Sequence, residues 1–205
     1  MIKEIFDASN KEHESSGKFS VSSIGSCWRK KYLEIKGLYK QRFDSQTQRT
    51  FDIGDMLHRQ AVKELLEKGE QFNIRVVASE VDIPTQKYIS GRADLILCNS
   101  KNKQMFVVDV KSAGDYTLNM AKNGQMHDNY IQQLQLYLHF FKLNEGYILV
   151  MGKHKSEIIE VQVKYDEQLC LKLIEEIEHF FVNNVEKNVE PGKCNGSKFK
   201  CDVCQ

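Results

Sequence analysis

Two apolar segments separated by a short polar turn constrain the fold of this chain most, because they predict a β-hairpin that brings two acids together. The segments span 88–98 and 105–111, and both are rich in residues that favour strands. If the hairpin folds symmetrically about the centre of its turn, Asp94 lies opposite Asp109. Opposed residues have Cβ atoms ~5 Å apart, where like charges are destabilising. The pair therefore needs a cation between the two carboxylates, or one of them must take a proton.

Lys111 adds a positive charge beside the two acids. It lies two residues beyond Asp109 and therefore projects from the same face of the strand. Oxygen ligands of this kind suit Mg²⁺ or Mn²⁺, and two carboxylates with a lysine have the spacing of a divalent-metal nuclease site. An Asp near a strand end is also typical of a turn, and the pattern D-x-K occurs by chance. The apolar run 106–108 favours a functional interpretation, because a charged pair at the end of a buried strand costs free energy unless it is used.

The size and composition of the chain predict a single domain. With 205 residues, 41% of them hydrophobic and 28% charged, the sequence is typical of a globular protein with a sizeable core. We expect a core at about 50–185 and an appendage formed by about 20–45 and 186–205. The formal net charge is only +1, but six basic residues and one acid occur between positions 29 and 42. No apolar run approaches the ~18 residues of a membrane span, and the N-terminus lacks the apolar stretch of a signal peptide, so we expect an intracellular protein.

Hydrophobic periodicity and capping signals predict the remaining elements. Helices are expected at about 54–68, 127–143 and 166–185, with a further helical segment at 27–37, and strands are expected at 72–83, 146–151 and 157–163. Together with the hairpin, this order indicates an α/β fold in which a mixed central sheet is flanked by helices.

Five short pieces of sequence occur in a characteristic order along the chain. They are Cys27-Trp28-Arg29-Lys30-Lys31-Tyr32, Gly54 with His58, Gly91-Arg92-Ala93-Asp94, Asp109-Val110-Lys111 and Gln133-Leu134-Gln135-Leu136-Tyr137. In this order they resemble the PD-(D/E)xK nuclease superfamily, and within it the RecB-like exonucleases. The likeness is greatest to the fourth CRISPR-associated protein family and its viral relatives. It implies a restriction-endonuclease-like core that carries a DNA-cutting site, with a cysteine-clipped subdomain formed by the two ends of the chain.

The resemblance implies a metal-dependent active site. Asp94, Asp109 and His58 would bind Mg²⁺ or Mn²⁺ together with the Val110 carbonyl, and Lys111 would orient or activate the attacking water. A neutral imidazole binds Mn²⁺ acceptably. A lone histidine in a helix is also typical of a packed or surface residue.

Two further parts of the resemblance concern the helix at 127–143 and the basic segment. Gln133 and Tyr137 are four residues apart and share a helix face. The family pattern places them beside the active site, where they position the lysine or the DNA, although both also suit polar positions on a buried helix. The basic segment offers cations for a phosphate backbone and aromatic rings for exposed bases. Its expected DNA-binding residues are Trp28, Arg29, Lys30, Lys31 and Tyr32.

The six cysteines are of two kinds. Cys98 and Cys170 have apolar neighbours and are expected to be core thiols. A polar tail holds Cys194, Cys201 and Cys204, and the last two form a C-x-x-C knuckle suited to a metal. In the RecB-like family, three late cysteines and one early cysteine, here Cys27, bind an iron–sulfur cluster. Four thiolates satisfy a [4Fe–4S] cluster or tetrahedral Zn²⁺. The lone Cys194 before the pair departs from the usual family order, and this leaves the type of metal centre open.

The sequence as a whole predicts a Mg²⁺- or Mn²⁺-dependent DNA exonuclease that acts on single-stranded or free ends, in CRISPR adaptation or in viral or archaeal recombination and repair. Its expected partners are DNA and, for a CRISPR role, an integrase complex. Its expected location is the cytoplasm, that of the host if the chain is viral. The alternatives are a degenerate nuclease fold, which the intact Asp94, Asp109 and Lys111 argue against, and a non-catalytic metal-clipped module that binds nucleic acid.

Overall fold

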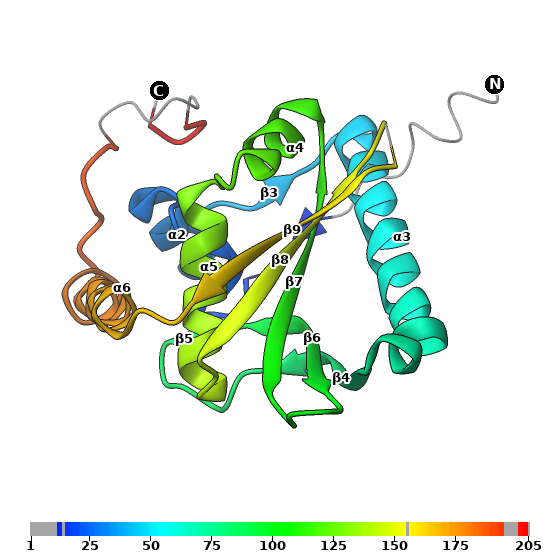
Figure 1. Cartoon of the computed structure of the whole chain (residues 1–205). Coiled ribbons are helices and arrows are strands. Elements are labelled where there is room, and N and C mark those ends of the chain that lie inside the picture. The colour runs from blue at the N-terminus through cyan, green and yellow to red at the C-terminus, as the bar shows by residue number, and fades with distance from the viewer. Residues whose placement is uncertain (1–11, 14, 155, 195–200, 205) are drawn as a thin grey trace, which may run out of the picture.

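A five-stranded mixed sheet forms the centre of the molecule (Figure 1). The computed structural model describes residues 12–13, 15–154, 156–194 and 201–204. The strand order is β4-β6-β7-β8-β9, in which β7 and β8 are parallel and the other neighbours are antiparallel. The strands span Ile74–Asp82 (β4), Arg92–Asn99 (β6), Met105–Ala113 (β7), Glu145–Gly152 (β8) and Ile158–Lys164 (β9).

The β6–β7 hairpin has the predicted register. Leu95 pairs with Val108, and Cys98 pairs with Met105 at the end near the turn. Continuing the same register past Leu95 places Asp94 opposite Asp109. The two acids therefore lie next to the paired segments 95–98 and 105–108, which are mostly apolar and buried.

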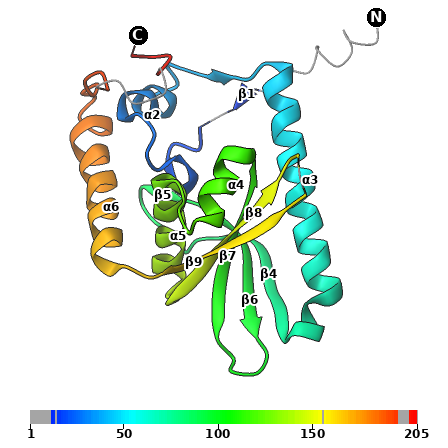
Figure 2. The same ribbon diagram turned by 45° about the horizontal axis from the view of Figure 1, so that its top comes forward.

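Helices cover both faces of the sheet (Figures 1 and 2). On one face α3 packs against β4 and β7, and on the other α4 and α5 pack against β7 and β8, with α6 outside α5. Val62 and Leu65 of α3 pack against the sheet, and α6 packs on α5. These helices span Ser45–Lys68 (α3), Asp115–Lys122 (α4), Asp128–Phe141 (α5) and Glu167–Phe180 (α6).

Shorter elements extend the core at the N-terminal side. The strand β2 pairs in parallel with β5, and a 3-10 turn that follows β2 packs against α5. β1 pairs with β3, and α2 lies next to the C-terminal tail (Figure 2). These elements span Glu12–His13 (β1), Phe19–Ser20 (β2), Val21–Ser23 (η1), Trp28–Ile35 (α2), Gln41–Arg42 (β3), Gly69–Phe72 (η2), Ile89–Ser90 (β5) and Phe181–Val185 (η3, a π-helical turn).

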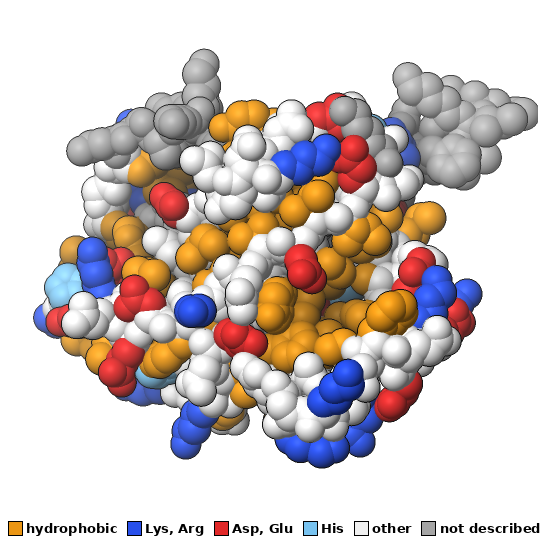
Figure 3. All heavy atoms as spheres, in the orientation of Figure 1, with side chains coloured by type: hydrophobic (Ala, Val, Ile, Leu, Met, Phe, Trp, Pro, Cys, Tyr) orange, Lys and Arg blue, Asp and Glu red, His pale blue; other side chains and the backbone are white. Residues whose placement is uncertain are grey.

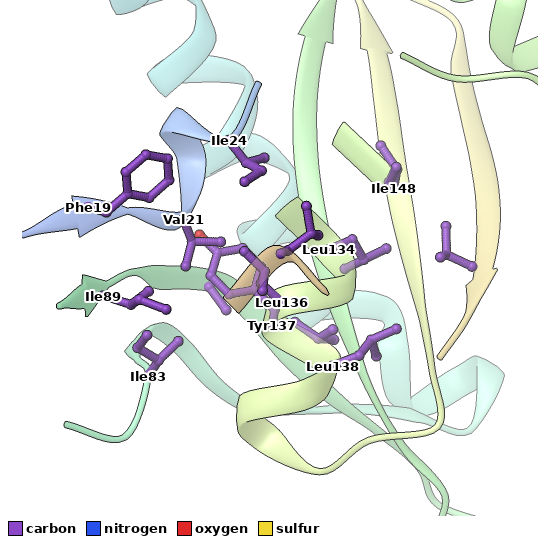
Figure 4. Close-up of a cluster of buried hydrophobic side chains, with 14 of the residues drawn as sticks. Phe19, Val21, Ile24, Ile83, Ile89, Leu134, Leu136, Tyr137, Leu138 and Ile148 are labelled. Atoms are coloured by element: carbon purple, nitrogen blue, oxygen red, sulfur yellow. The ribbon is translucent and has the colours of Figure 1, made fainter. Parts of the chain in front are cut away.

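Two apolar clusters hold these layers together. The larger one surrounds α5, and Figure 4 shows Phe19 and Val21 on one side of this helix and Ile148 of β8 on the other. Because α5 has neighbours on all sides, Leu134, Leu136 and Leu138 are all completely buried. The smaller cluster lies under α3 and contains Leu95, Leu97 and Val108.

The observed elements confirm the predicted fold class and correct several boundaries. The first long helix begins at Ser45, not near Gly54, because the Asp44 side chain accepts a hydrogen bond from the Thr47 amide (2.7 Å) and caps it. The helix α4 was not predicted; it is one of the shortest helices and follows directly on β7. The helix predicted at 166–185 leaves α-helical geometry at Phe181.

The surface seen in Figure 3 has no dominant charge. Lys, Arg, Asp and Glu side chains mix around its rim, and hydrophobic side chains gather across the middle. Among the helices of the described ranges, none has the length and apolar character needed to cross a bilayer.

Candidate active site and cysteine cluster

The two predicted carboxylates meet at the end of the β6–β7 hairpin. Asp109 is only 1% exposed and faces α5, because Val107 on the same strand face packs in the α5 cluster while Val108 and Val110 pack under α3. Asp94 accepts a hydrogen bond from the Val110 amide through Oδ2 (2.7 Å). A buried acid beside a half-buried one on the neighbouring strand forms an electrostatically costly pair unless a cation balances them.

The acids change each other's proton affinity. Burial, followed by the charge of Asp109, raises the pKa of Asp94 from 3.8 to about 6. Burial also raises the pKa of Asp109, against the opposing effect of Lys111. Paired groups with raised pKa values in a cavity are typical of functional sites.

Lys111 and Gln133 form a bridge across Asp109. Lys111 Nζ lies 2.7 Å from Asp109 Oδ2 and donates a hydrogen bond to Gln133 Oε1 (3.0 Å). Gln133 Nε2 in turn donates to Asp109 Oδ1 (3.1 Å). The Tyr130 ring lies 5.1 Å from the ammonium group, at cation–π distance. The lysine therefore contacts Asp109, Gln133 and the Tyr130 ring, and the last two come from α5.

Tyr137 supports the start of β6. Its hydroxyl donates to the Arg92 carbonyl (2.8 Å) and accepts from Gln133 Nε2 (3.3 Å). Beside it, a Cβ added at Gly91 would lie 2.8 Å from Val21 Cγ2 and 3.2 Å from Tyr137 Cε1. Glycine thus permits the close packing that brings Tyr137 to the strand, which explains the glycine three residues before Asp94.

His58 reaches the acids from α3. Its Nε2 atom is buried without a hydrogen-bond partner and lies 3.9 Å from Asp94 Oδ1. One turn earlier in α3, a Cβ added at Gly54 would lie 3.1 Å from Ser112 Oγ, so the glycine lets this part of the helix approach β7. The structure therefore brings His58 to the site, as predicted, and the pairing of Gly54 with His58 has a packing reason.

Glu80 is a site residue that sequence reasoning missed. Its carboxylate lies 3.4 Å from His58 Nδ1 and 2.7 Å from Arg92 Nε. The residue has a φ of 53°, unusual for a non-glycine residue, on a strand that contains a register shift between Val76 and Ala78. Nothing in the alternating pattern of β4 signals this local conformation, which turns the carboxylate toward the histidine.

The residues at this site fit a hard divalent cation. Ligand atoms of His58, Glu80 and Asp94 all lie within 4.8 Å of one another. The unpartnered His58 Nε2 and the buried carboxylates are the donors that Mg²⁺ and Mn²⁺ accept. With Glu80 beside its Nδ1 atom, the imidazole can keep Nε2 free of a proton, the arrangement seen for metal-binding histidines.

A cavity of about 1160 Å³ opens over these residues. Its wall includes the candidate site residues His58, Asp94, Lys111, Gln133 and Tyr137. Val110 also lines it, so the position predicted for a carbonyl ligand is at the site. Further cationic side chains on the wall are Arg59, Arg92 and Lys153. The acids Asp55 and Glu80 also line it, so the site is an open hollow of mixed charge whose basic side chains offer contacts to an anionic substrate.

We expect the metal-free Asp94→Asn protein to be more stable than the parent above pH 6. The pKa of Asp94 rises from 3.8 to about 6 on folding, so the folded state binds this proton more tightly than the unfolded state does. The stability that comes from this proton is fully present below pH 3.8 and is lost as pH rises through 6. Asparagine removes the charge, a gain of about 1–3 kcal/mol at pH 8. Thermal unfolding in chelator at pH 4 to 8 should show a difference that widens with pH. A difference that does not change with pH contradicts the assignment.

Four cysteines form a second cluster between α2 and the tail. The Sγ atoms of Cys27, Cys194, Cys201 and Cys204 lie within 4.8 Å of one another. None of the described cysteines is in a disulfide. The Cys194 amide donates to Cys204 Sγ (3.4 Å) and lowers the pKa of that thiol to about 7, which favours the thiolate that binds metals. The predicted ligand set is therefore assembled, although residues 195–200 and 205 of the predicted appendage lie outside the described part.

The spacing of the thiols suits one tetrahedral ion. Cys27 Sγ and Cys204 Sγ are 3.6 Å apart, and Zn–S bonds of ~2.3 Å place the sulfurs of a ZnS₄ site ~3.8 Å apart. In a [4Fe–4S] cluster each thiolate binds a different iron, so the sulfurs must lie farther apart than these do. The other two cysteines, Cys98 and Cys170, are buried in the core, as predicted.

The predicted DNA-binding residues have other partners in the structure. Tyr32 is buried, and Trp28 packs between Phe19 and Phe180 with ring centroids 5.3 and 4.9 Å away. This packing corrects the expectation that these two rings stack on bases, because it turns them into the protein. The three cations at 29–31 pair with acids: Arg29 with Glu190 (2.5 Å), Lys30 with Asp202 (3.3 Å) and Lys31 with Glu34 (2.7 Å).

Solved structures share this fold. The alkaline exonuclease LHK-Exo of Laribacter hongkongensis matches with a TM-score of 0.64 at 16% identity, over 85% of this chain and 90% of that one. LHK-Exo in complex with dAMP matches with a TM-score of 0.63 at 17% identity, over 85% and 90% of the two chains. A protein named SSO0001 matches with a TM-score of 0.51 at 24% identity, over 81% and 77%. No family model and no curated protein matches the sequence.

These likenesses define the class of the fold. The chain is an α/β protein with the mixed five-stranded sheet and flanking helices of its exonuclease neighbours, which confirms the predicted restriction-endonuclease-like core. At these identities the comparison concerns the fold, and the function has to be argued from the site.

Proposed function

We propose that this chain is a divalent-metal-dependent nuclease that hydrolyses DNA phosphodiester bonds from free, single-stranded ends. The observation that carries the proposal is the assembly of His58, Asp94 and Lys111 on the wall of one open cavity, with the buried Asp109 paired to Lys111 behind that wall. This assembly lies on a fold shared with the exonuclease LHK-Exo, which has also been solved in complex with dAMP. Asp109 is nearly inaccessible to water, and a charge pair buried in this way with Lys111 costs free energy unless it is used.

In this proposal the chain holds the metal with His58, Asp94, Asp109 and the Val110 carbonyl. A bound Mg²⁺ or Mn²⁺ supplies Lewis-acid stabilisation of the phosphate and makes water a better nucleophile. Glu80 orients the His58 imidazole from behind, since its carboxylate lies on the Nδ1 side of the ring. Replacing either Asp94 or Asp109 would therefore remove a metal ligand, and we expect the variant to fold.

Lys111 is the proposed electrophilic residue. Its ammonium group donates hydrogen bonds to the attacking water or to the phosphate oxygens, where negative charge develops. Gln133 keeps the ammonium group near the acids by accepting one of its hydrogen bonds. Tyr137 holds the start of β6 against α5 through its hydrogen bond to the Arg92 carbonyl. The lysine cannot bind the metal while protonated, so its role differs from that of the acids.

The four cysteines are proposed to hold a structural metal centre that fastens the tail to α2. The resemblance implies a [4Fe–4S] cluster, whereas the sulfur spacing favours Zn²⁺. Arg29, Lys30 and Tyr39 reinforce this attachment through Glu190 and Asp202. The whole chain would then work as one nuclease domain in which the core at about 50–185 carries the site and 20–45 with 186–205 form the clipped appendage.

The biological setting is proposed from the resemblance alone. It places the protein in the cytoplasm, either in CRISPR adaptation beside an integrase complex or in viral or archaeal recombination and repair.

Paired DNA substrates test the proposed function. We expect Mn²⁺ to support degradation of a linear single-stranded DNA, and excess chelator to abolish it. A covalently closed circle of the same sequence should persist, because it offers no end. Degradation of the circle at the linear rate would reject the exonuclease part of the proposal. If both substrates persist in Mg²⁺ and in Mn²⁺ while the protein binds them, the chain is a non-catalytic module.

A further inference from the structure

A second cavity lies beside the active-site cavity and shares part of its wall. It has a volume of about 480 Å³ and is bounded by 15–23, the end of α2 and 37–41. Ser20 and Ser22 line both cavities. Their hydroxyl groups are hydrogen-bonded to each other at 2.8 Å, so they form a polar junction between the two hollows.

The wall of the second cavity consists mainly of hydrogen-bond donors. Among the described residues, three lysines and five serines line it, against one carboxylate, that of Glu34. Lys31 pairs with this carboxylate (2.7 Å), whereas Lys18 donates to the uncharged Gln86 carbonyl (2.6 Å). Lys40 is exposed at the rim. The excess of cations and hydroxyls suits the phosphate groups of a nucleic-acid backbone.

The junction between the two cavities is held in place by packing and by backbone hydrogen bonds. Val21, between the two serines, is completely buried in the α5 cluster and contacts the Gly91–Tyr137 packing. Just before it, the Phe19 amide donates to the Tyr88 carbonyl (2.8 Å) as β2 pairs with β5. With its apolar neighbour anchored on α5, the turn presents Ser20 and Ser22 to the two cavities in a fixed position.

We propose that the strand cut at Asp94 and Asp109 continues past Ser20 and Ser22 into the second cavity, where Lys18 and Lys40 bind its phosphates. This inference rests on the proposed function, which it extends by assigning a substrate path. A hollow of this volume is the size of a small-ligand pocket, enough for a short stretch of one strand and too small for a double helix. The path therefore selects single-stranded nucleic acid.

Substrate length separates this cavity from the active site. A 4-nucleotide DNA seated over the metal ligands has too few phosphates to fill both cavities, whereas a 20-nucleotide DNA occupies both. For the Lys18→Ala/Lys40→Ala protein we expect the KM for the 20-mer to rise roughly 10-fold more than the KM for the 4-mer. Two lost phosphate contacts should also reduce the slope of log affinity against log salt by about 1.4. The matched control is Lys101→Ala/Lys103→Ala, which removes two exposed lysines from the distant β6–β7 turn.

Binding without cleavage keeps the test independent of the proposed function. Fluorescence anisotropy of a labelled 20-mer in chelator should show weaker binding by the Lys18→Ala/Lys40→Ala protein and parental binding by the control. This result supports the strand path even if the parent protein proves unable to cut DNA. Equal effects of the two double variants, equal effects on 4-mer and 20-mer, or tighter binding of duplex than of single strands would each overturn the proposed path.

Discussion

Replacing Lys111 with alanine is expected to slow DNA cleavage roughly 100- to 1000-fold, the usual cost of removing one group that stabilises developing charge. The affinity for Mn²⁺ should stay within a few-fold of the parent value or rise. The ammonium group lies 2.7 Å from Asp109 Oδ2 and repels any cation bound at that carboxylate. Asp109→Asn should instead weaken Mn²⁺ binding, because it removes a charged ligand.

Calorimetric Mn²⁺ titration and single-turnover cleavage measure these two effects separately. Lys101→Ala is the matched control, since it removes a lysine from the exposed turn of the same hairpin. Circular dichroism should show that all three variants fold like the parent. A Lys111→Ala protein that loses metal affinity as strongly as Asp109→Asn contradicts the division of roles between lysine and acids.

Replacing Cys27 with serine is expected to release the metal of the cysteine cluster and to lower the stability of the protein substantially. A metal bound by the folded state alone contributes its binding free energy to folding. Cys27 precedes α2 and is 177 positions away from Cys204 in the chain. A metal ion bound by both thiolates would therefore join two distant parts of the sequence. Thermal unfolding with elemental analysis of the same anaerobic samples measures both effects.

The control and the metal type follow from the same samples. Cys98→Ala should keep the full metal content, since Cys98 lies in the core away from the cluster. The sulfur spacing predicts about one zinc per chain, and about four irons with four sulfides would establish the cluster that the resemblance implies. Parent protein that contains neither metal, with four freely reactive thiols, contradicts the clip.

The hairpin and its acids could be predicted from sequence because the information is local. A polar turn between two apolar strands sets the register, and the register places Asp94 opposite Asp109. The side of the strand taken by Lys111 follows from the same alternation. Helical spacing likewise predicted that Gln133 and Tyr137 share a face, and the structure adds that Gln133 bridges Lys111 and Asp109.

The rest of the site depends on packing between distant segments. Glu80 joins His58 because β4 has a register shift and a left-handed residue, neither of which alternation reveals. Trp28 and Tyr32 belong to a basic segment in sequence, yet α2 turns their rings toward Phe19 and Phe180 or into the core. The second cavity was also beyond prediction, since its wall depends on how the stretch 15–23 packs beside 31–41.

In the proposed mechanism, His58, Asp94 and Asp109 bind the divalent cation that the protein needs to cleave DNA. The most direct test is the rate of cleavage of an end-labelled single-stranded DNA as a function of Mn²⁺ concentration, for the parent and for Asp109→Asn. We expect the rate for the parent to rise with Mn²⁺ and saturate. For the variant, we expect the rate at every Mn²⁺ concentration to equal that measured in excess chelator. A variant that cleaves as fast as the parent at matched Mn²⁺ would contradict this mechanism.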